Sequence, residues 1–160
     1  MRKDVAQTSE EERMLIFRLQ DKDLGLNIAC VREVLIPQKI QLLPRAPNFI
    51  EGVINLREYI IVVIDLRKKF NMTPLENKAD QRIILCKIKT FIVGIIVDSV
   101  SKISSFSKHD IQSTPEILSL QMPNSCFTGI IRAGERVIAI LDLEKVLTQE
   151  EIANLSEIKK

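Results

Sequence analysis

The 160-residue chain has 46% hydrophobic residues, 28% charged residues and a formal net charge of +2. This weak charge excludes the large basic field of a nucleic-acid-binding protein. The longest uncharged apolar run, Tyr59–Ile64, is far shorter than the roughly 20 residues that cross a bilayer. Because residues 1–13 also lack the apolar stretch of a signal peptide, we expect a soluble, cytoplasmic protein.

Short segments rich in Ile and Val, separated by polar residues, Gly, Pro or Asn, predict a mainly β protein. Frequent turns favour a β-barrel or sandwich over a parallel sheet with crossover helices. The polar segments predict a loose tail over 1–13 and an internal connection over 71–81. In chain order, the predicted strands are 14–19, 24–31, 59–65, 82–88, 90–98 and 136–142.

Helical signals follow two of these strands and recur at the C-terminus. Asp65 and Asp142 come where a strand ends, which predicts that each caps a helix of one or two turns. Residues 148–160 predict a longer helix, because Thr148 and Glu151 have the spacing of a capping box. An apolar stripe on this helix is predicted to consist of Ile152, Leu155 and Ile158.

The two halves of the chain resemble each other. At an offset of 77 residues, "EGVINLREYIIVVIDL" aligns with "TGIIRAGERVIAILDL", which matches Gly52 with Gly129. At an offset of 69, "LGLNIACV" aligns with "VGIIVDSV", which matches Gly25 with Gly94. Each half is therefore interpreted as one β-unit. The last part of each unit has, in order, a glycine, an apolar segment, a reversing turn, an apolar strand and Asp-Leu. The glycine before each final hairpin predicts a close approach of the backbone that a Cβ atom would block.

A β-unit of about 65 residues buries too little surface alone, so the two units are expected to share a core with a groove between them. We therefore predict one domain over 14–147, with a first subdomain mainly over 24–75 and a second mainly over 81–147. The sequence leaves open whether the subdomains exchange strands.

Residues for catalysis or metal binding are sparse, so we predict neither an enzyme nor a cofactor or metal site. His109 is the single histidine and lies in a polar segment that reads as a surface loop or short turn. Cys30, Cys86 and Cys126 have apolar neighbours and no metal-ligand spacing, which is typical of buried apolar cysteines. Five dispersed glycines cannot form a phosphate loop.

A non-catalytic binding module is the better interpretation, and "ACVREVLIPQKI" is its best candidate surface. In an extended segment Val31 faces one way, while Arg32 and Glu33 mark an edge. The alternative, that Val31 and Val34 belong to the core, stays open on pattern alone.

Three motifs in order, "PNFIEGVINLR", "VIDLRKKF" and "VGIIVDSV", closely resemble the CheW family of bacterial chemotaxis proteins. The resemblance runs from about Met14 to Leu155. It implies two five-stranded SH3-like β-barrels around a shared hydrophobic core, and no enzymatic activity. It further implies a cytoplasmic scaffold, a monomer when free, that is recruited to receptor arrays at the inner face of the membrane without inserting into it.

The partners that the resemblance implies are the regulatory domain of the histidine kinase CheA and the cytoplasmic hairpin tip of chemoreceptors. Positions similar to the receptor-binding set of the family are Val31, Glu33, Arg57, Ile60 and Ile103. Arg57 either donates to the receptor or has a structural role, such as holding its own hairpin or pairing with Glu33. The kinase-binding residues are not identified by the sequence.

Two positions depart from the family. The family usually has Gly after Asn-Leu-Arg, where this chain has Glu58, and often has Pro at the position of Val62. If the turn needs a positive φ at Glu58, the substitution costs about 1 kcal/mol. Alternatives to chemotaxis coupling are an adaptor of another chemosensory pathway, such as pilus motility, and a small-ligand-binding β-barrel.

Overall fold

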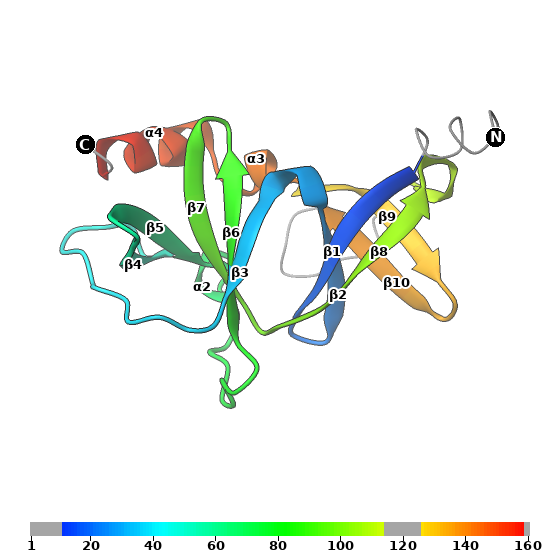
Figure 1. Cartoon of the computed structure of the whole chain (residues 1–160), viewed down its shortest axis with the longest axis horizontal. Coiled ribbons are helices and arrows are strands. Elements are labelled where there is room, and N and C mark those ends of the chain that lie inside the picture. Colours follow the sequence, from blue (N-terminus) through cyan, green and yellow to red (C-terminus); the bar gives the residue numbers. More distant parts are fainter. Residues whose placement is uncertain (1–10, 114–125, 159–160) are drawn as a thin grey trace.

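The computed structural model describes residues 11–113 and 126–158, with side chains in the last helix described as far as residue 154. Within these residues, ten strands form two five-stranded sheets that lie next to each other (Figure 1), which confirms the mainly β class. Sheet A has the order β8-β1-β2-β10-β9. Its strands are β1 (Glu11–Leu19), β2 (Lys22–Asn27), β8 (Ser99–Ser107), β9 (Phe127–Ala133) and β10 (Arg136–Leu141).

Sheet B has the order β3-β6-β7-β5-β4. Its strands are β3 (Val31–Leu35), β4 (Ile50–Leu56), β5 (Tyr59–Asp65), β6 (Arg82–Ile88) and β7 (Phe91–Val97). Each sheet therefore combines two strands from one half of the chain with three from the other. Two parallel pairs, β2 with β10 and β5 with β7, join strands from different halves of the chain. All other neighbouring strands are antiparallel.

The two sheets share the largest hydrophobic cluster. Phe17 and Leu24 enter it from sheet A, Val62 and Ile95 enter it from sheet B, and all four side chains are at most 1% exposed. Each such side chain contributes about 1.5–3 kcal/mol by leaving water. A smaller apolar cluster belongs to each sheet alone, around Val63 in sheet B and around residues of β1, β9 and β10 in sheet A. The expected shared core is therefore present.

The predicted strand 24–31 is interrupted, which corrects the sequence analysis. A 3-10 turn, η1 (Ile28–Cys30), separates β2 from β3 because the Asn27 side chain accepts a hydrogen bond from the Ala29 backbone N–H. This turn carries the chain from sheet A to sheet B. Strand β8 was not predicted, because its serine-rich sequence lacks an alternating apolar pattern. Backbone pairing with β1 holds it in place.

The predicted role of two glycines is confirmed. A Cβ atom at Gly52 would lie 2.2 Å from the carbonyl oxygen of Gln41, and one at Gly129 would lie 2.5 Å from that of Gln112. In both halves the glycine lets the preceding connection form a β-bridge, from Gln41 to Val53 and from Gln112 to Ile130. These equivalent contacts support the internal repeat.

Helices follow both final strands, as predicted. Asp65 caps α2 (Leu66–Lys69) by accepting from the backbone N–H groups of Arg67 and Lys68. Asp142 caps α3 (Leu143–Val146) by accepting from Glu144. The C-terminal helix α4 (Gln149–Ile158) is also present, and Ile152 is buried in the shared core. The predicted positions of Leu155 and Ile158 on its stripe, and residues 1–10 of the predicted tail, lie outside the described side chains and residues. Residues 11–13 of that predicted tail belong to β1 instead.

A largely but not fully buried ion pair joins the two sheets at the point where β7 leads into β8. The guanidinium of Arg67 donates to both carboxylate oxygens of Asp98, at 2.8 and 2.6 Å, and each side chain is only 12% exposed. Asp98 also accepts from the backbone N–H of Gln20, in the β1–β2 turn of sheet A. Sequence analysis noted both residues within motifs but not their contact, which brings together positions 31 residues apart.

Candidate functional site

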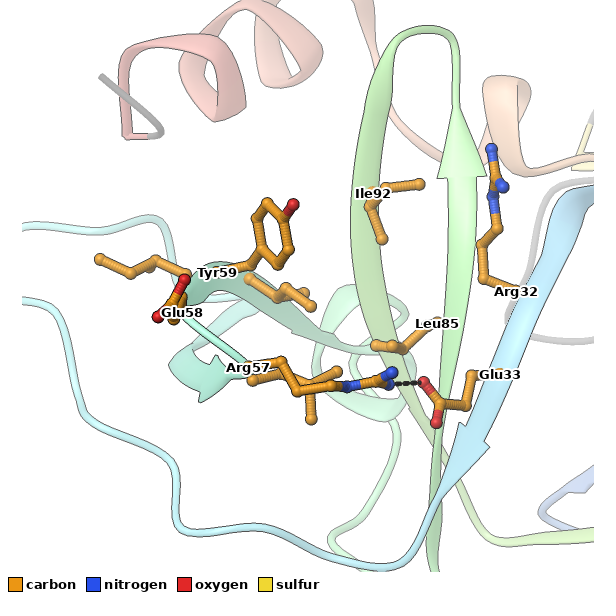
Figure 2. Close-up of a pocket in the computed structure, with 10 residues that line it drawn as sticks. Arg32, Glu33, Arg57, Glu58, Tyr59, Leu85 and Ile92 are labelled. Atoms are coloured by element: carbon orange, nitrogen blue, oxygen red, sulfur yellow. Dashed lines mark hydrogen bonds and ion pairs between the residues drawn. The ribbon is translucent and has the colours of Figure 1, made fainter.

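A groove with a volume of about 810 Å³ opens on sheet B between β3 and the β4–β5 hairpin (Figure 2). Its charged lining balances, with two arginines and two glutamates: Arg32, Glu33, Arg57 and Glu58. Its apolar and aromatic lining is Leu56, Tyr59, Ile60, Ile61, Leu85 and Ile92. We call this surface the Arg57 groove. A groove that is apolar at its base and charged at its edges suits a polypeptide segment.

The ion pair between Arg57 and Glu33 crosses this groove. Figure 2 shows Arg57 extending from the β4–β5 turn toward Glu33 on β3, with 2.5 Å between Nη2 and Oε2. The two strands β3 and β4 are opposite edges of sheet B, so the sheet curls to bring these side chains together. Their side chains are 69% and 41% exposed, and an exposed ion pair contributes at most about 1 kcal/mol to folding.

The hairpin turn presents Arg57 to solvent. Leu56 pairs with Tyr59, so Arg57 and Glu58 alone form the turn, and both have positive φ, 47° and 75°. Two positive φ values are the signature of the tight turn that matches the twist of a β-hairpin. Tyr59 and Ile60 then leave the turn 73% and 56% exposed, and Ile61 begins the buried part of β5.

Three of the five candidate residues from the sequence lie together in the Arg57 groove: Glu33, Arg57 and Ile60. Val31 precedes the groove on β3, is half-buried, and packs against the shared core. Ile103 is 48% exposed on β8 of sheet A and does not line the groove. Both interpretations of Arg57 are compatible with this geometry, since the side chain pairs with Glu33 and is also accessible.

Sequence analysis missed several groove residues. Leu85 and Ile92 come from the second half of the chain and reach the groove only because β6 and β7 join the strands of the first half. No local signal identifies them. Tyr59 did carry a signal, because it is the single tyrosine and directly follows the turn that holds Arg57.

Groups suited to catalysis are not assembled in the described part of the chain. Residues 11–113 and 126–158 contain no cluster of three or more His, Cys, Asp or Glu that could hold a metal ion. Burial raises the pKa of the Cys30 thiol, and the charges of Asp142 and Glu144 raise it further, so the thiol stays protonated at neutral pH. Burial likewise raises the pKa of Cys86. His109 lies exposed in a 3-10 turn, as predicted.

Comparison with known proteins identifies the family. The family model of the CheW-like domain matches residues 13–151, nearly the whole chain. The chain belongs to the CheW family. It is 32% identical to the chemotaxis protein CheW of Klebsiella aerogenes over 93% of this chain and 89% of that protein. It is 33% identical to CheW of Rhizobium meliloti over 90% of this chain and 92% of that protein.

A solved CheW has the same fold. The crystal structure of the scaffolding protein TtCheW from Thermoanaerobacter tengcongensis matches with a TM-score of 0.78 and 31% sequence identity. The match covers 88% of this chain and 90% of that one. The chain is thus a non-catalytic CheW scaffold of chemotaxis, which couples receptors to CheA. Among the described residues, no helix has the length and apolar character to span a membrane.

Proposed function

We propose that the Arg57 groove holds the cytoplasmic hairpin tip of a chemoreceptor while another surface of the chain binds the regulatory domain of CheA. The observation that carries this proposal is the convergence of Glu33, on β3, with Arg57 and Ile60, on the β4–β5 hairpin, at one accessible groove. A scaffold needs exposed side chains that a partner can cover, and the exposed apolar side chains of Tyr59 and Ile60 supply them.

Arg57 is suited to recognise the receptor by hydrogen bonding. Its Nη2 group contacts Glu33, and the guanidinium carries further N–H donors in a planar fork that matches a carboxylate or a backbone carbonyl. Glu33 holds the fork in one orientation, which lowers the entropy lost on binding. We propose that Val31 and Ile103 extend the receptor surface beyond the groove with apolar area.

Glu58 distinguishes this groove from the corresponding surface of most family members. Its carboxylate lines the groove at the turn position where the family usually has glycine. A negative charge there would favour receptor tips with a basic residue at the facing position and disfavour acidic ones. The charge of Glu58 therefore supports the proposal that this chain binds a particular set of receptors. These receptors belong either to chemotaxis or to a second chemosensory pathway such as pilus motility. The free protein is proposed to be a cytoplasmic monomer that joins receptor arrays through these contacts.

A titration of the Arg57→Ala variant against a purified receptor cytoplasmic fragment tests the proposal. We expect binding to weaken about tenfold, because hydrogen bonds to charged groups contribute about 1.5–3 kcal/mol. The unfolding free energy should change by less than about 1 kcal/mol, because the ion pair with Glu33 is exposed. Isothermal titration calorimetry and urea unfolding measure the two quantities.

The matched control is Arg132→Ala, which removes an exposed arginine from β9 of the other sheet. It should bind the receptor fragment like the parent protein. Unchanged receptor affinity in Arg57→Ala would overturn the proposed groove assignment. Loss of folding in Arg57→Ala would show that the residue is structural.

A further inference from the structure

The internal repeat gives the Arg57 groove a counterpart on sheet A. A second hollow of about 370 Å³ lies between β8 and the β9–β10 hairpin. Seven of its ten lining residues correspond to residues of the Arg57 groove at the repeat offsets of 69 and 77 residues. At its base, Ile16 takes the place of Leu85 and Ile138 takes the place of Ile61. We call this surface the Arg136 groove.

The apolar base is retained in the Arg136 groove. Ile16 and Ile138 are 4% and 6% exposed and belong to the apolar cluster of sheet A. Phe106 packs against the same cluster and also lines the groove. Phe106 is half-buried and therefore leaves apolar area open to a ligand. A polypeptide can place an apolar side chain on it, whereas a phosphate or a free carboxylate cannot.

The charged edge differs between the two grooves. Lys102 occupies the position of Glu33, and Arg136 occupies the position of Tyr59. The four charged residues of the Arg57 groove cancel, whereas Lys102 and Arg136 outnumber the single lining carboxylate, Asp23. The repeat therefore has the apolar base in both grooves, and the smaller Arg136 groove has a positive charge.

Asp23 does not reverse this balance. Its side chain is 11% exposed and forms ion pairs with two arginines, with Nη2 of Arg136 at 2.5 Å and with Nη1 of Arg18 at 3.4 Å. These contacts neutralise the carboxylate and hold Arg136, which is itself 63% exposed, at the edge of the groove. Lys102 is exposed on β8 across from it. Two cations at the edge with an apolar base match an acidic segment that carries apolar residues.

We propose that the Arg136 groove is a second docking site, which binds an acidic, partly apolar polypeptide segment of a partner protein. The Arg136 groove lies on sheet A and the Arg57 groove lies on sheet B, so one chain can hold two segments at the same time. The assignment does not depend on which ligand occupies the Arg57 groove.

A labelled synthetic peptide of twelve alternating Glu and Leu residues tests the proposal by fluorescence anisotropy. We expect the parent chain to bind it and to lose affinity as salt rises, because the contacts are partly electrostatic. Lys102→Glu should weaken binding at least tenfold. The substitution is chosen because Lys102 is exposed, whereas replacement of Arg136 would disturb Asp23. NMR shift changes on addition of the peptide should centre on β8 and β10.

The matched control is Lys87→Glu, which makes the same charge change at an exposed position of β6 in sheet B. It should bind the peptide like the parent chain, and a Lys–Leu peptide of the same length should not bind. Absence of binding by the Glu–Leu peptide would overturn the proposal. Equal losses in Lys102→Glu and Lys87→Glu, or shift changes centred on the Arg57 groove, would also overturn it. Receptor binding by Lys102→Glu should be unchanged, which separates this test from that of Arg57.

Discussion

Arg57 and Glu58 show how one turn both exposes the Arg57 side chain to solvent and strains the backbone. Their φ values of 47° and 75° lie in the left-handed region, where a Cβ atom clashes with the backbone. The positive φ of Glu58 meets the condition under which this residue was predicted to cost about 1 kcal/mol relative to glycine. The equivalent turn of sheet A has Gly134 at φ 67°, and its second residue, Glu135, is not among the described residues with positive φ.

Glu58→Gly is predicted to raise the free energy of unfolding by about 1 kcal/mol, because glycine adopts positive φ without a steric penalty. Urea unfolding followed by circular dichroism measures the change. The matched control is Glu135→Gly at the equivalent position of the other hairpin, which should give no gain and a small loss. A similar change in both variants would contradict the explanation from backbone strain.

The C-terminal helix α4 is held by a capping box at its N-terminus and by Lys69 of α2. Thr148 and Glu151 form the predicted capping box, in which each backbone N–H donates to the side chain of the other, at 2.8 and 3.1 Å. The ammonium of Lys69, on α2, contacts both carboxylate oxygens of Glu151 at 2.9 and 2.8 Å. Lys69 also lies 5.2 Å from the centre of the Phe49 ring. The box was predictable because it is local, while its link to Lys69 was not.

Glu151→Gln is predicted to destabilise the docked helix by about 2 kcal/mol at neutral pH, since the lost hydrogen bonds are charged. Burial raises the pKa of Glu151, but hydrogen bonds from Lys69 and Thr148 together hold it below its ordinary value. A carboxyl with a lowered pKa stabilises the fold above its ordinary pKa of about 4.3, and the contribution fades as pH falls below that.

The difference in unfolding free energy between the parent chain and Glu151→Gln should therefore shrink from neutral pH toward about pH 3. Hydrogen exchange of the α4 amides and urea unfolding at several pH values measure this. The control Glu150→Gln alters an exposed neighbour and should have little effect. A gap that does not change with pH would show that the carboxylate of Glu151 is not the stabilising group.

At the scale of the whole molecule, the two halves of the sequence are interlaced rather than placed end to end. Removing either half of the chain would take two or three strands from each sheet. It would also take one strand of each parallel pair. The shared core takes side chains from both sheets, and the Arg67–Asp98 pair ties α2 to the crossing from β7 to β8. Cooperative folding should therefore require both halves.

Separate fragments 1–76 and 77–160 are predicted not to fold alone and to regain the native fold when mixed. Far-UV circular dichroism and the dispersion of amide chemical shifts in NMR spectra test each fragment and the mixture. The control is the intact chain cleaved between residues 76 and 77, in the connection between α2 and β6, which should remain associated. A cooperative unfolding transition in either isolated fragment would contradict this interpretation.

Much of the fold could be predicted because the signals are local. Asp65 and Asp142 cap helices at the positions where the sequence changes from apolar to polar, and the glycines of the final hairpins mark close backbone contacts. Of the candidate site, Glu33, Arg57 and Ile60 come together as the family resemblance suggested. Their role in receptor binding stays a prediction, as do those of Val31 and Ile103.

The sequence by itself determined the mainly β class, the repeated unit, the caps and the family, because each depends on residues close together in the chain or on a motif order. Tertiary structure alone decided which half supplies which strand, and hence that Leu85 and Ile92 reach the Arg57 groove and that Arg67 meets Asp98. The physical reason is that strand pairing uses backbone hydrogen bonds common to all residues. Local sequence therefore predicts a strand but does not identify its neighbour.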